Sequence, residues 1–374
     1  MNNEQKDKFR RELADKFIHL LEEKKMNWIQ GWDSGPGGPP FNLASGRRYT
    51  GINQFTLSLT SMIEGYNDPR WATMTQIRDE KGIYHKGEKW HVRKGSHGQK
   101  VEYWFPYDRK NKKPLTWNEY KNELDSGREK TDFLIQPKYF TVFNASQIEG
   151  IPPLKKEERP EIKTDEIIPK LAKEMGVMMD FSPDPRAYYS PDRDMIHLPT
   201  ANLFHSSAEF HGTALHEFAH ATGHPSRLNR DVKNIFGTEK YAAEELVAEM
   251  TSCFMSVNLK DVDLGSFNNF ENNEAYLQGW VEAIQNKPDA LIRAVKEATR
   301  ATDYMEMKAG IITETEYNRT RSFEKITSND SEKTEEPVKK IEGKIPETVK
   351  KPEEIIPPTV VNPTHRPSQV RLHM

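Results

Sequence analysis

The sequence predicts an α+β protein with a small mixed N-terminal domain, a mainly helical second domain and a disordered tail. Basic, aromatic and β-branched residues alternate between glycines from about 82 to 144, as in short strands. Apolar residues recur at helical spacing in several stretches between about 206 and 310. Beyond about residue 325 the chain has no aromatic residue, and its Lys, Glu and Pro cannot bury enough apolar surface to fold.

Changes in composition place the domain boundaries. We expect a first domain over 1–150, a charged, proline-containing linker over 151–166, a second domain over 167–321 and the tail over 322–374. A single cysteine suits a reducing compartment. The N-terminus "MNNEQKDKFRRELADKF" is too charged for a secretory signal, and no stretch approaches the roughly 20 apolar residues of a membrane span. The expected localisation is therefore cytoplasmic, without a membrane partner.

The first domain is expected to begin with a helix over 4–26, where Phe9, Leu13 and Phe17 recur at helical spacing. A loop rich in Gly and Pro follows, "GWDSGPGGPPFNLASGRRYTG", and then a second helix in "INQFTLSLTSMIEGY". Strands are expected within 82–107 and 132–144.

The second domain is expected to open with a helix in "IIPKLAKEMGVMMD", followed by two short strands around a turn in "RAYYSPDRDMIHLP". A helix over about 206–223 precedes a strongly helical stretch, "TEKYAAEELVAEMTSCFMSVNL", and two further helical stretches reach about residue 310. Cys253 lies among apolar residues of this region and is expected in the core.

The stretch "GTALHEFAHATGHPSRL" contains an HExxH motif on a predicted helix. Residues four apart share a helix face, so the imidazoles of His216 and His220 can bind one zinc ion. Glu217 lies beside them and can act as the general base for a metal-bound water. The alternative is a surface helix that is merely rich in histidine. The neighbouring residues are apolar, however, and burying these polar groups without a metal would be costly.

A third ligand is expected from the next helix, in "YAAEELVAEM". Glu245 and Glu249 lie four residues apart, so Glu245 can bind the metal while Glu249 accepts the second N–H of a ligand histidine. Glu244 is an alternative for either role. HExxH followed by such a helix resembles the glutamate-zincin pattern, except that its last acid, normally Asp, is Glu here. The competing interpretation of these acids is a solvated helix face.

His224 is a further alternative ligand, one turn beyond His220. Gly223 and Pro225 predict that the helix ends before it, which would turn His224 away from the site.

A metal at this motif predicts hydrolysis of a peptide bond, with Glu217 passing a proton from water to the leaving amine. The segment "DMIHLP" is expected to form an edge strand along which an extended peptide can lie. Tyr188, Tyr189 and His197 are considered as oxyanion donors, with a structural role as the alternative for each.

The first 150 residues combine aromatic rings with positive charge. They hold six of the seven tryptophans and a net charge of +5, against −8 for the remainder. Cations along phosphates and rings beneath unstacked bases are what single-stranded nucleic acid requires. The alternative is that the rings fill a core and the lysines lie on an ordinary surface. The candidate contacts are Arg47, Arg48, Tyr49, Trp71, Lys86, Lys89, Trp90, Arg93, Lys94 and Trp104.

These motifs together resemble the antirestriction protein ArdC family. In the N-terminal half the resemblance rests on "PPFNLASGRRYTGIN", "GYNDPRWATMTQI", "KGEKWHVRKG" and "YFTVFNASQIEGI". In the C-terminal half it rests on "TALHEFAHATGHPSRLNRD" and "FGTEKYAAEELVAEM", and it spans about residues 5–305. The resemblance implies an N-terminal domain that binds single-stranded DNA and a C-terminal zincin-like metallopeptidase domain. By position, it implies that His216, His220 and an acid of "EELVAE" bind the metal, with Glu217 as the base.

The combined expectation is an antirestriction protein of a plasmid or other conjugative element. It would bind single-stranded DNA without sequence preference and hold Zn²⁺, or another divalent transition metal, in a peptidase-type site that acts on a protein substrate. One alternative is an intracellular zinc metalloprotease whose N-terminal domain recognises protein substrates. Another is a DNA-binding protein with a non-catalytic zincin domain. The sequence carries no indication of oligomeric state.

Overall fold

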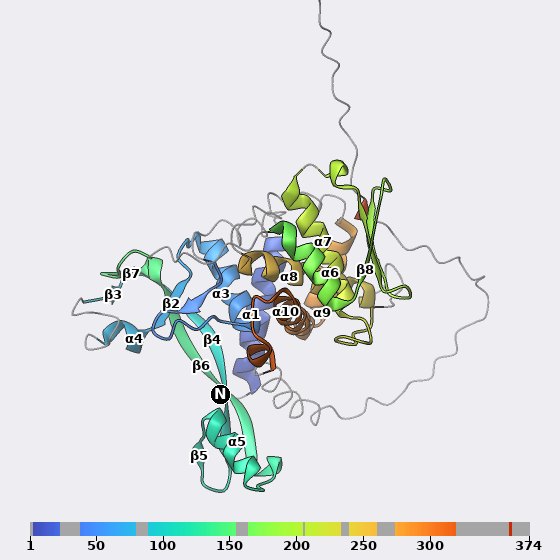
Figure 1. The fold of residues 1–374 in the computed structure, drawn as a ribbon. Coiled ribbons are helices and arrows are strands. Elements are labelled where there is room, and N and C mark those ends of the chain that lie inside the picture. The colour runs from blue at the N-terminus through green and yellow to red at the C-terminus, as the bar shows by residue number, and fades with distance from the viewer. Residues whose placement is uncertain are drawn as a thin grey trace, which may run out of the picture.

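The computed structural model describes residues 3–22, 38–79, 89–154, 164–204, 206–232, 239–259, 274–318 and 359–360. Within these ranges the protein has the predicted α+β architecture, with a sheet-containing N-terminal part and a mainly helical C-terminal part (Figure 1). The tail, apart from residues 359–360, lies outside the described residues, as do most of the predicted linker and Lys86.

A five-stranded sheet organises the N-terminal part, in the order β1-β2-β6-β4-β5. Its strands are β1 (Phe41–Asn42), β2 (Arg70–Thr73), β4 (Gln99–Asp108), β5 (Lys113–Pro114) and β6 (Phe133–Asn144). Strands β4 and β6 pair antiparallel along the whole of β4, and the long ribbon that they form carries β5 and α5 (Trp117–Asp125) at its far end (Figure 1). These two strands confirm the prediction of strands within 82–107 and 132–144.

Apart from α1 (Asn3–Glu22), the remaining elements of this part lie around the sheet. They are α3 (Gly51–Glu64), α4 (Met74–Arg78), a small pair of strands β3 (His91–Val92) and β7 (Ile148–Glu149), and the 3-10 turns Lys130–Asp132 and Ala145–Gln147. Helix α5 begins with a capping box, in which Thr116 and Glu119 each satisfy the other's backbone N–H. At the far end of the ribbon, Arg128 Nη1 lies 2.6 Å from the fully buried Asp108 carboxylate and ties the turn after α5 to β4.

The C-terminal part packs a small sheet against helices. Helix α6 (Thr164–Met175) leads into β8 (Met178–Ser182), β9 (Arg186–Ser190) and β10 (Met195–Pro199). A 3-10 turn (Ala201–Leu203) then precedes α7 (Ser207–Thr222), α8 (Glu239–Asn258), α9 (Glu274–Asn286) and α10 (Asp289–Ala309), and residues 314–318 are helical. The strand order is β11-β9-β10-β8, where β11 is the short segment Thr359–Val360.

The expectation that "DMIHLP" forms an edge strand is wrong. This segment contains β10, which pairs with β8 on one side and β9 on the other. Ile196 and Leu198 are fully buried and His197 is nearly so, because both faces of a central strand are covered. The strand beside the helix of the HExxH motif is β9, and β11 pairs antiparallel with it at Ala187 and Arg186.

The two parts share a hydrophobic core. Helix α1 (Asn3–Glu22) and α3, both from the N-terminal part, bury side chains in one cluster with α8, α9 and α10. Phe17 and Phe55 meet edge to face in this cluster, with ring centroids 5.4 Å apart, and neither is exposed. The domain boundaries remain a prediction, but the packing joins α1 to the C-terminal helices.

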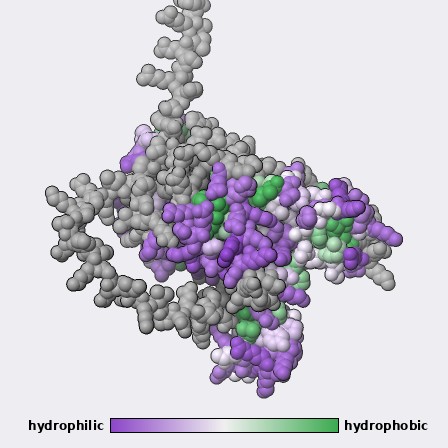
Figure 2. Space-filling model, turned by 180° about the vertical axis from the view of Figure 1, so that it is seen from behind, coloured by the Kyte–Doolittle hydropathy of each residue, from purple (hydrophilic) through white to green (hydrophobic). Residues whose placement is uncertain are grey.

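Most of the described surface is hydrophilic when the molecule is seen from behind, with small, separate hydrophobic areas (Figure 2). In the described ranges, no helix has both the length and the apolar character required to cross a bilayer. Among the described residues, the exposed large hydrophobic side chains are Ile63, Tyr103, Leu134, Phe140, Met178 and Phe181.

Candidate functional site

Helix α7 presents the HExxH residues. It begins after Ser206, whose hydroxyl accepts the N–H of Glu209 at 3.1 Å, and it ends at Thr222. A Cβ at Gly223 would collide with the side chain of Val232, so the chain can turn away closely only with glycine there. The predicted end of the helix before His224 is confirmed.

Three side chains from α7 and α8 direct ligand atoms toward a common point. The Nε2 atoms of His216 and His220 lie 3.1 Å apart. Glu245 places one carboxylate oxygen 3.4 Å from His216 Nε2 and the other 3.6 Å from His220 Nε2. Ligand atoms around a tetrahedral zinc, with bonds of about 2.0–2.1 Å, are roughly 3.3 Å apart. The spacing of these three groups therefore fits a small divalent cation.

The other ring nitrogens show why this point suits a cation. His216 Nδ1 lies 3.3 Å from Glu249 Oε1, and His220 Nδ1 lies 3.3 Å from Glu244 Oε1. Each Nδ1–H can donate to its carboxylate, so each Nε2 presents a lone pair toward the other and toward Glu245. Three electron-rich atoms at this distance repel one another unless a positive charge lies between them. The donor set thus fits a metal ion.

The pKa values of His216, His220 and Glu245 reflect the carboxylates that surround the two histidines. Burial opposes a charge on His216, but the carboxylates of Glu249 and Glu245 outweigh it and raise the pKa well above its usual value. Burial is likewise outweighed at His220, whose pKa is raised by Glu245 and Glu244. Burial alone would raise the pKa of Glu245, but the two histidines lower it to about 2. A site that attracts a proton so strongly also attracts a divalent cation.

Glu217 lies beside the cluster and is only 2% exposed. The backbone N–H of Tyr189, in β9, donates to its carboxylate. Burial raises the pKa of Glu217 above its usual value, although the charges of His216 and His220 oppose the rise. A carboxylate with a raised pKa is a better proton acceptor, as a general base requires.

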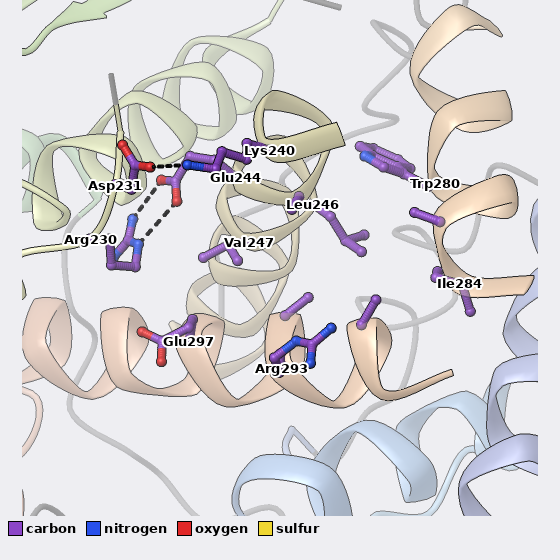
Figure 3. Close-up of a pocket in the computed structure, with 14 residues that line it drawn as sticks. Arg230, Asp231, Lys240, Glu244, Leu246, Val247, Trp280, Ile284, Arg293 and Glu297 are labelled. Atoms are coloured by element: carbon purple, nitrogen blue, oxygen red, sulfur yellow. Dashed lines mark hydrogen bonds and ion pairs between the residues drawn. The ribbon is translucent and has the colours of Figure 1, made fainter. Parts of the chain in front are cut away.

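Arg230, which was not among the site residues predicted from the sequence, binds the carboxylate of Glu244. Arg230 Nη2 lies 2.8 Å from Glu244 Oε1 and Arg230 Nε lies 3.2 Å from Oε2, and the two side chains face one another in Figure 3. Arg230 also donates to Thr222 Oγ1 at 2.6 Å and to the Ala219 carbonyl at 2.8 Å, so it is anchored to the end of α7. Arg230 holds Glu244, which in turn orients His220. A lone arginine beyond a helix end gave no sequence signal for this role.

The remaining candidates of the C-terminal part make other contacts. His224 Nδ1 lies 2.7 Å from Ser226 Oγ, and His224 is not among the described groups that could hold a metal. The Tyr189 hydroxyl donates to Asp194 Oδ1 at 2.8 Å. Tyr188 stacks on His197 with ring centroids 5.0 Å apart, and His197 Nδ1 lies 2.8 Å from Asp180. These contacts favour structural roles for the two tyrosines and His197. Cys253 is buried in the core, as expected.

Two of the ten candidate nucleic-acid contacts are core residues. Trp71 is 1% exposed and Trp90 is 6% exposed, each within a hydrophobic cluster under the sheets. Neither ring can stack on a base without opening the core, so this part of the expectation is corrected. Tyr49 and Trp104 are half-buried. The exposed candidates are Arg47, Arg48, Lys89, Arg93 and Lys94.

Other rings lie at the surface of the β4–β6 ribbon. Tyr103 and Phe140, both exposed, have ring centroids 6.3 Å apart, and Phe105 continues the row 6.5 Å from Tyr103. Lys138 Nζ lies 5.2 Å above the Phe140 ring. None of these four residues is among the ten candidate contacts, because alternation in a strand does not show which face is covered. We refer to these four residues as the ribbon face.

Two family models match the chain. The N-terminal domain of anti-restriction factor ArdC matches residues 7–143, and a zincin-like metallopeptidase model matches residues 166–297.

Two solved structures of the antirestriction ArdC protein from plasmid R388 are similar to most of this chain. The metal-free structure has 28% sequence identity and a TM-score of 0.60, covering 81% of this chain and 98% of that one. The Mn(II)-bound structure has 30% identity and the same TM-score, covering 80% of this chain and 97% of that one.

Curated relatives include two Escherichia coli proteins named DNA primase TraC, each 34% identical over 81% of this chain. The chain spans only 27% and 20% of their lengths. An uncharacterized protein of Sinorhizobium fredii, y4eC, is 27% identical, covering 78% of this chain and 90% of that protein.

Proposed function

This chain belongs to the ArdC antirestriction family and carries a zincin-like metallopeptidase domain, and on that premise we propose that it binds single-stranded DNA and hydrolyses peptide bonds at a divalent-metal centre. Both activities would serve a mobile element whose DNA enters a new host. The single observation that carries the peptidase proposal is the convergence of His216, His220 and Glu245 beside the buried Glu217.

His216, His220 and Glu245 would hold the metal ion. When bound, a divalent ion supplies Lewis-acid activation of a water molecule and of the substrate carbonyl. Two imidazoles and one carboxylate suit Zn²⁺, and Mn(II) is the ion bound by the R388 protein. Glu249 and Glu244 keep the two Nδ1 atoms protonated, which leaves each Nε2 free as a ligand. Glu217 accepts the proton from water and delivers it to the leaving nitrogen.

The outer edge of β9 is the proposed position of the peptide substrate. The Tyr189 N–H on this edge reaches Glu217, and Ala187, two residues earlier, pairs with Thr359 of β11. Backbone groups two residues apart in a strand point to the same side, so both contacts lie along one edge. An extended peptide that adds to β9 in the direction of β11 would therefore run past the metal centre.

The ribbon face and the exposed cations of the N-terminal part are the proposed DNA-binding surface. Tyr103, Phe105 and Phe140 offer rings on which bases can stack, and Lys138 adds a charge beside them. Arg93 and Lys94 are exposed on the loop after β3. Stacking and phosphate contacts require no particular base, so the proposed binding is sequence-tolerant.

Metal analysis tests the centre. Purified wild type dialysed with excess Zn²⁺ should retain about one ion per chain, whereas Glu245→Ala should lose most of it. Glu217→Gln is the matched control, since it leaves all three ligands in place and should keep the metal while losing turnover. A folded wild type that takes up no divalent cation would refute the proposed centre.

Titration of an unstructured oligonucleotide against salt tests DNA binding. Affinity should fall as salt rises, because cations on the protein displace counterions from the phosphates. A Kd no tighter than that of an acidic control protein would contradict the proposal. The double variant Lys89→Glu, Arg93→Glu distinguishes DNA binding from the alternative in which the N-terminal part recognises protein substrates. Under that alternative, DNA binding is unchanged in the variant and the choice of peptide substrate changes.

The same Glu217→Gln variant separates a non-catalytic zincin domain from an active peptidase. If the domain only binds, antirestriction measured in a conjugation assay should be unaffected by the loss of the base. If proteolysis is required, protection of the entering DNA should fall with turnover.

A further inference from the structure

Two arginines follow α7, and they contact different sides of the proposed centre. Arg230 pairs with Glu244, which lies behind the metal ligands. Arg227 instead donates to the carbonyl of Ala221, in the last turn of α7, at 2.6 Å and to the carbonyl of Met175, at the end of α6, at 3.2 Å. Its side chain is only 3% exposed. Arg227 therefore joins the ends of two helices.

Arg227 also binds Asp194, in the turn between β9 and β10. Arg227 Nη1 lies 3.0 Å from Asp194 Oδ2, and Arg227 Nη2 donates to Oδ1. Asp194 Oδ1 accepts the hydroxyl of Tyr189 at 2.8 Å as well, and Arg227 Nη2 lies 3.3 Å from that hydroxyl oxygen. Burial opposes a charge on Asp194, but Arg227 and Tyr189 outweigh it and lower the pKa of the carboxyl group. The ionised carboxylate thus binds both partners.

Tyr189 connects this ion pair to Glu217. Tyr189 belongs to β9 and is 7% exposed. Its backbone N–H donates to the Glu217 carboxylate, while its hydroxyl is held by Asp194 and Arg227. The contacts form a closed path that begins at Ala221, in α7, and returns to α7 at Glu217. This path fixes β9 against α7 through both the side chain and the backbone of one residue.

The position of β9 matters for two parts of the proposed reaction. A general base must lie within hydrogen-bond reach of the proton that it accepts, and a displacement of about 1 Å can cost about a hundredfold in rate. The Tyr189 N–H orients the Glu217 carboxylate, and the outer edge of β9 is the proposed position of the peptide. In the described part of the chain, no hydrogen bond or ion pair of Arg227 reaches a proposed metal ligand. The ion pair is therefore placed to act on the base and the peptide.

We propose that Arg227 and Asp194 are positioning residues of the peptidase, which hold Tyr189 so that its N–H fixes the Glu217 carboxylate beside the outer edge of β9. This inference rests on the proposed function and adds to it two residues that act through Tyr189. Breaking the Arg227–Asp194 pair should lower turnover at full metal occupancy, whereas loss of Arg230 should weaken metal binding.

The variant Arg227→Lys tests the proposal, because lysine keeps the charge but lacks the planar fork that binds two carboxylate oxygens. In the full chain loaded with Zn²⁺, we expect kcat for a cleavable peptide to fall by about 10–100-fold. Metal analysis should still find about one ion per chain. Residue-resolved hydrogen exchange should show the Tyr189 amide exchanging about tenfold faster or more, because its strand is held less firmly.

The variant Arg128→Lys is the matched control. Arg128 pairs with the buried Asp108 at the far end of the ribbon, so the same replacement breaks a comparable ion pair away from the centre. The control should lower the melting temperature and leave kcat per folded molecule and Tyr189 exchange as in wild type. If Arg227→Lys behaves like this control, the pair is only structural and the inference is overturned. A loss of Zn²⁺ in Arg227→Lys that parallels the loss of kcat would also overturn it, because the pair would then act on the metal.

Two milder variants test the proposal if Arg227→Lys does not fold. Asp194→Asn keeps the shape of the side chain and removes its charge, and Tyr189→Phe removes only the hydroxyl. Both should lower kcat and speed exchange of the amide at position 189. Where the double variant Arg227→Lys, Asp194→Asn folds, it should be no slower than the slower single variant, because residues that act as a unit are not additive. Additive losses of kcat would contradict a shared action.

Hydrogen exchange separates this inference from the proposed function. A wild type without turnover would refute the peptidase, but the Tyr189 amide would still report whether the Arg227–Asp194 pair holds β9. Faster exchange in Arg227→Lys then supports the positioning of β9, and unchanged exchange overturns it.

Discussion

The proposed metal centre and the ribbon face, which is the proposed DNA-binding surface, arrange their side chains in opposite ways. In the centre, His216, His220 and Glu245 are mostly buried, and each contacts another charged group within 3.6 Å. On the ribbon face, Tyr103 and Phe140 are exposed and spaced more than 6 Å apart by centroid. A buried cluster depends on the position of single atoms, whereas an exposed surface adds many small contributions. Single substitutions should therefore act strongly on the first and weakly on the second.

The largest effect is expected at Glu217. Replacing it by Gln removes the proton acceptor and should lower kcat for a cleavable peptide by about 10²–10⁴-fold, with little change in metal content. Steady-state kinetics with parallel metal analysis would measure both. Wild-type turnover in Glu217→Gln would contradict the expectation that single substitutions act strongly in the buried cluster, because its most buried acid would then be dispensable.

A large effect on stability, but not on DNA contact, is expected at Trp71. Its ring is fully packed, meeting Tyr66 edge to face at 6.1 Å, so Trp71→Ala should lower the free energy of unfolding by about 3–5 kcal/mol. Urea denaturation would measure the change. Oligonucleotide affinity per folded molecule should stay near that of wild type. A selective loss of affinity in a fully folded variant would indicate that Trp71 contacts DNA.

A smaller effect is expected at Arg230, which acts on the proposed ligand His220 through Glu244. Arg230→Ala removes the partner of Glu244 and so loosens the orientation of His220, which should weaken metal affinity by about 10–100-fold. Competition with a metal-binding dye would measure it. Lys240→Ala is the control, because Lys240 lines one pocket together with Arg230 and Glu244 but pairs with Asp231 at 3.1 Å instead (Figure 3). Equal losses in both variants would argue against a specific role for Arg230.

Removal of a single ring from the ribbon face should have a still smaller effect, in this case on oligonucleotide affinity. Tyr103→Ala removes one stacking surface and should weaken oligonucleotide binding about fivefold or more, while the salt dependence stays unchanged because no charge is lost. Fluorescence anisotropy at several salt concentrations would separate the two. Lys138→Ala, its neighbour on the paired strand, should instead reduce the slope against salt by about one unit. A changed slope in Tyr103→Ala would contradict the stacking role.

The smallest effect is expected from the tail. Because β11 occupies the edge of β9 that leads to Glu217, a chain ending at residue 350 should cleave an extended peptide about twofold faster, mainly through a lower KM. A chain in which Thr359 and Val360 are replaced by Pro, which cannot donate to the strand, should behave in the same way. Slower cleavage after truncation would exclude competition at this edge.

Much of the metal centre could be predicted from local patterns. His216, Glu217 and His220 follow from the geometry of one helix, and Glu245 follows from the face that it shares with Glu249 on the next. Arg230 could not be predicted, because its contacts with Glu244 and Thr222 depend on how the chain turns after Gly223. The end of α7 was predicted, whereas His224, kept as an alternative ligand, is not in the described group that could hold a metal.

The candidate nucleic-acid contacts show what local sequence patterns cannot predict. Tryptophan and tyrosine were equally good stacking candidates in the sequence, but the structure buries Trp71 and Trp90 and exposes Tyr103 and Phe140. The placement of "DMIHLP" at a sheet edge failed for the same reason, since strand order depends on partners distant in the chain.

The sequence by itself determined the α+β class, the helix that carries HExxH and the charge difference between the two halves, because helical spacing and composition are properties of neighbouring residues. Only the tertiary structure decided which rings are exposed, which strand lies beside Glu217, and that Arg230 pairs with Glu244. These features arise when segments far apart in the chain are packed together, and burial of their surfaces, rather than local propensity, selects the arrangement.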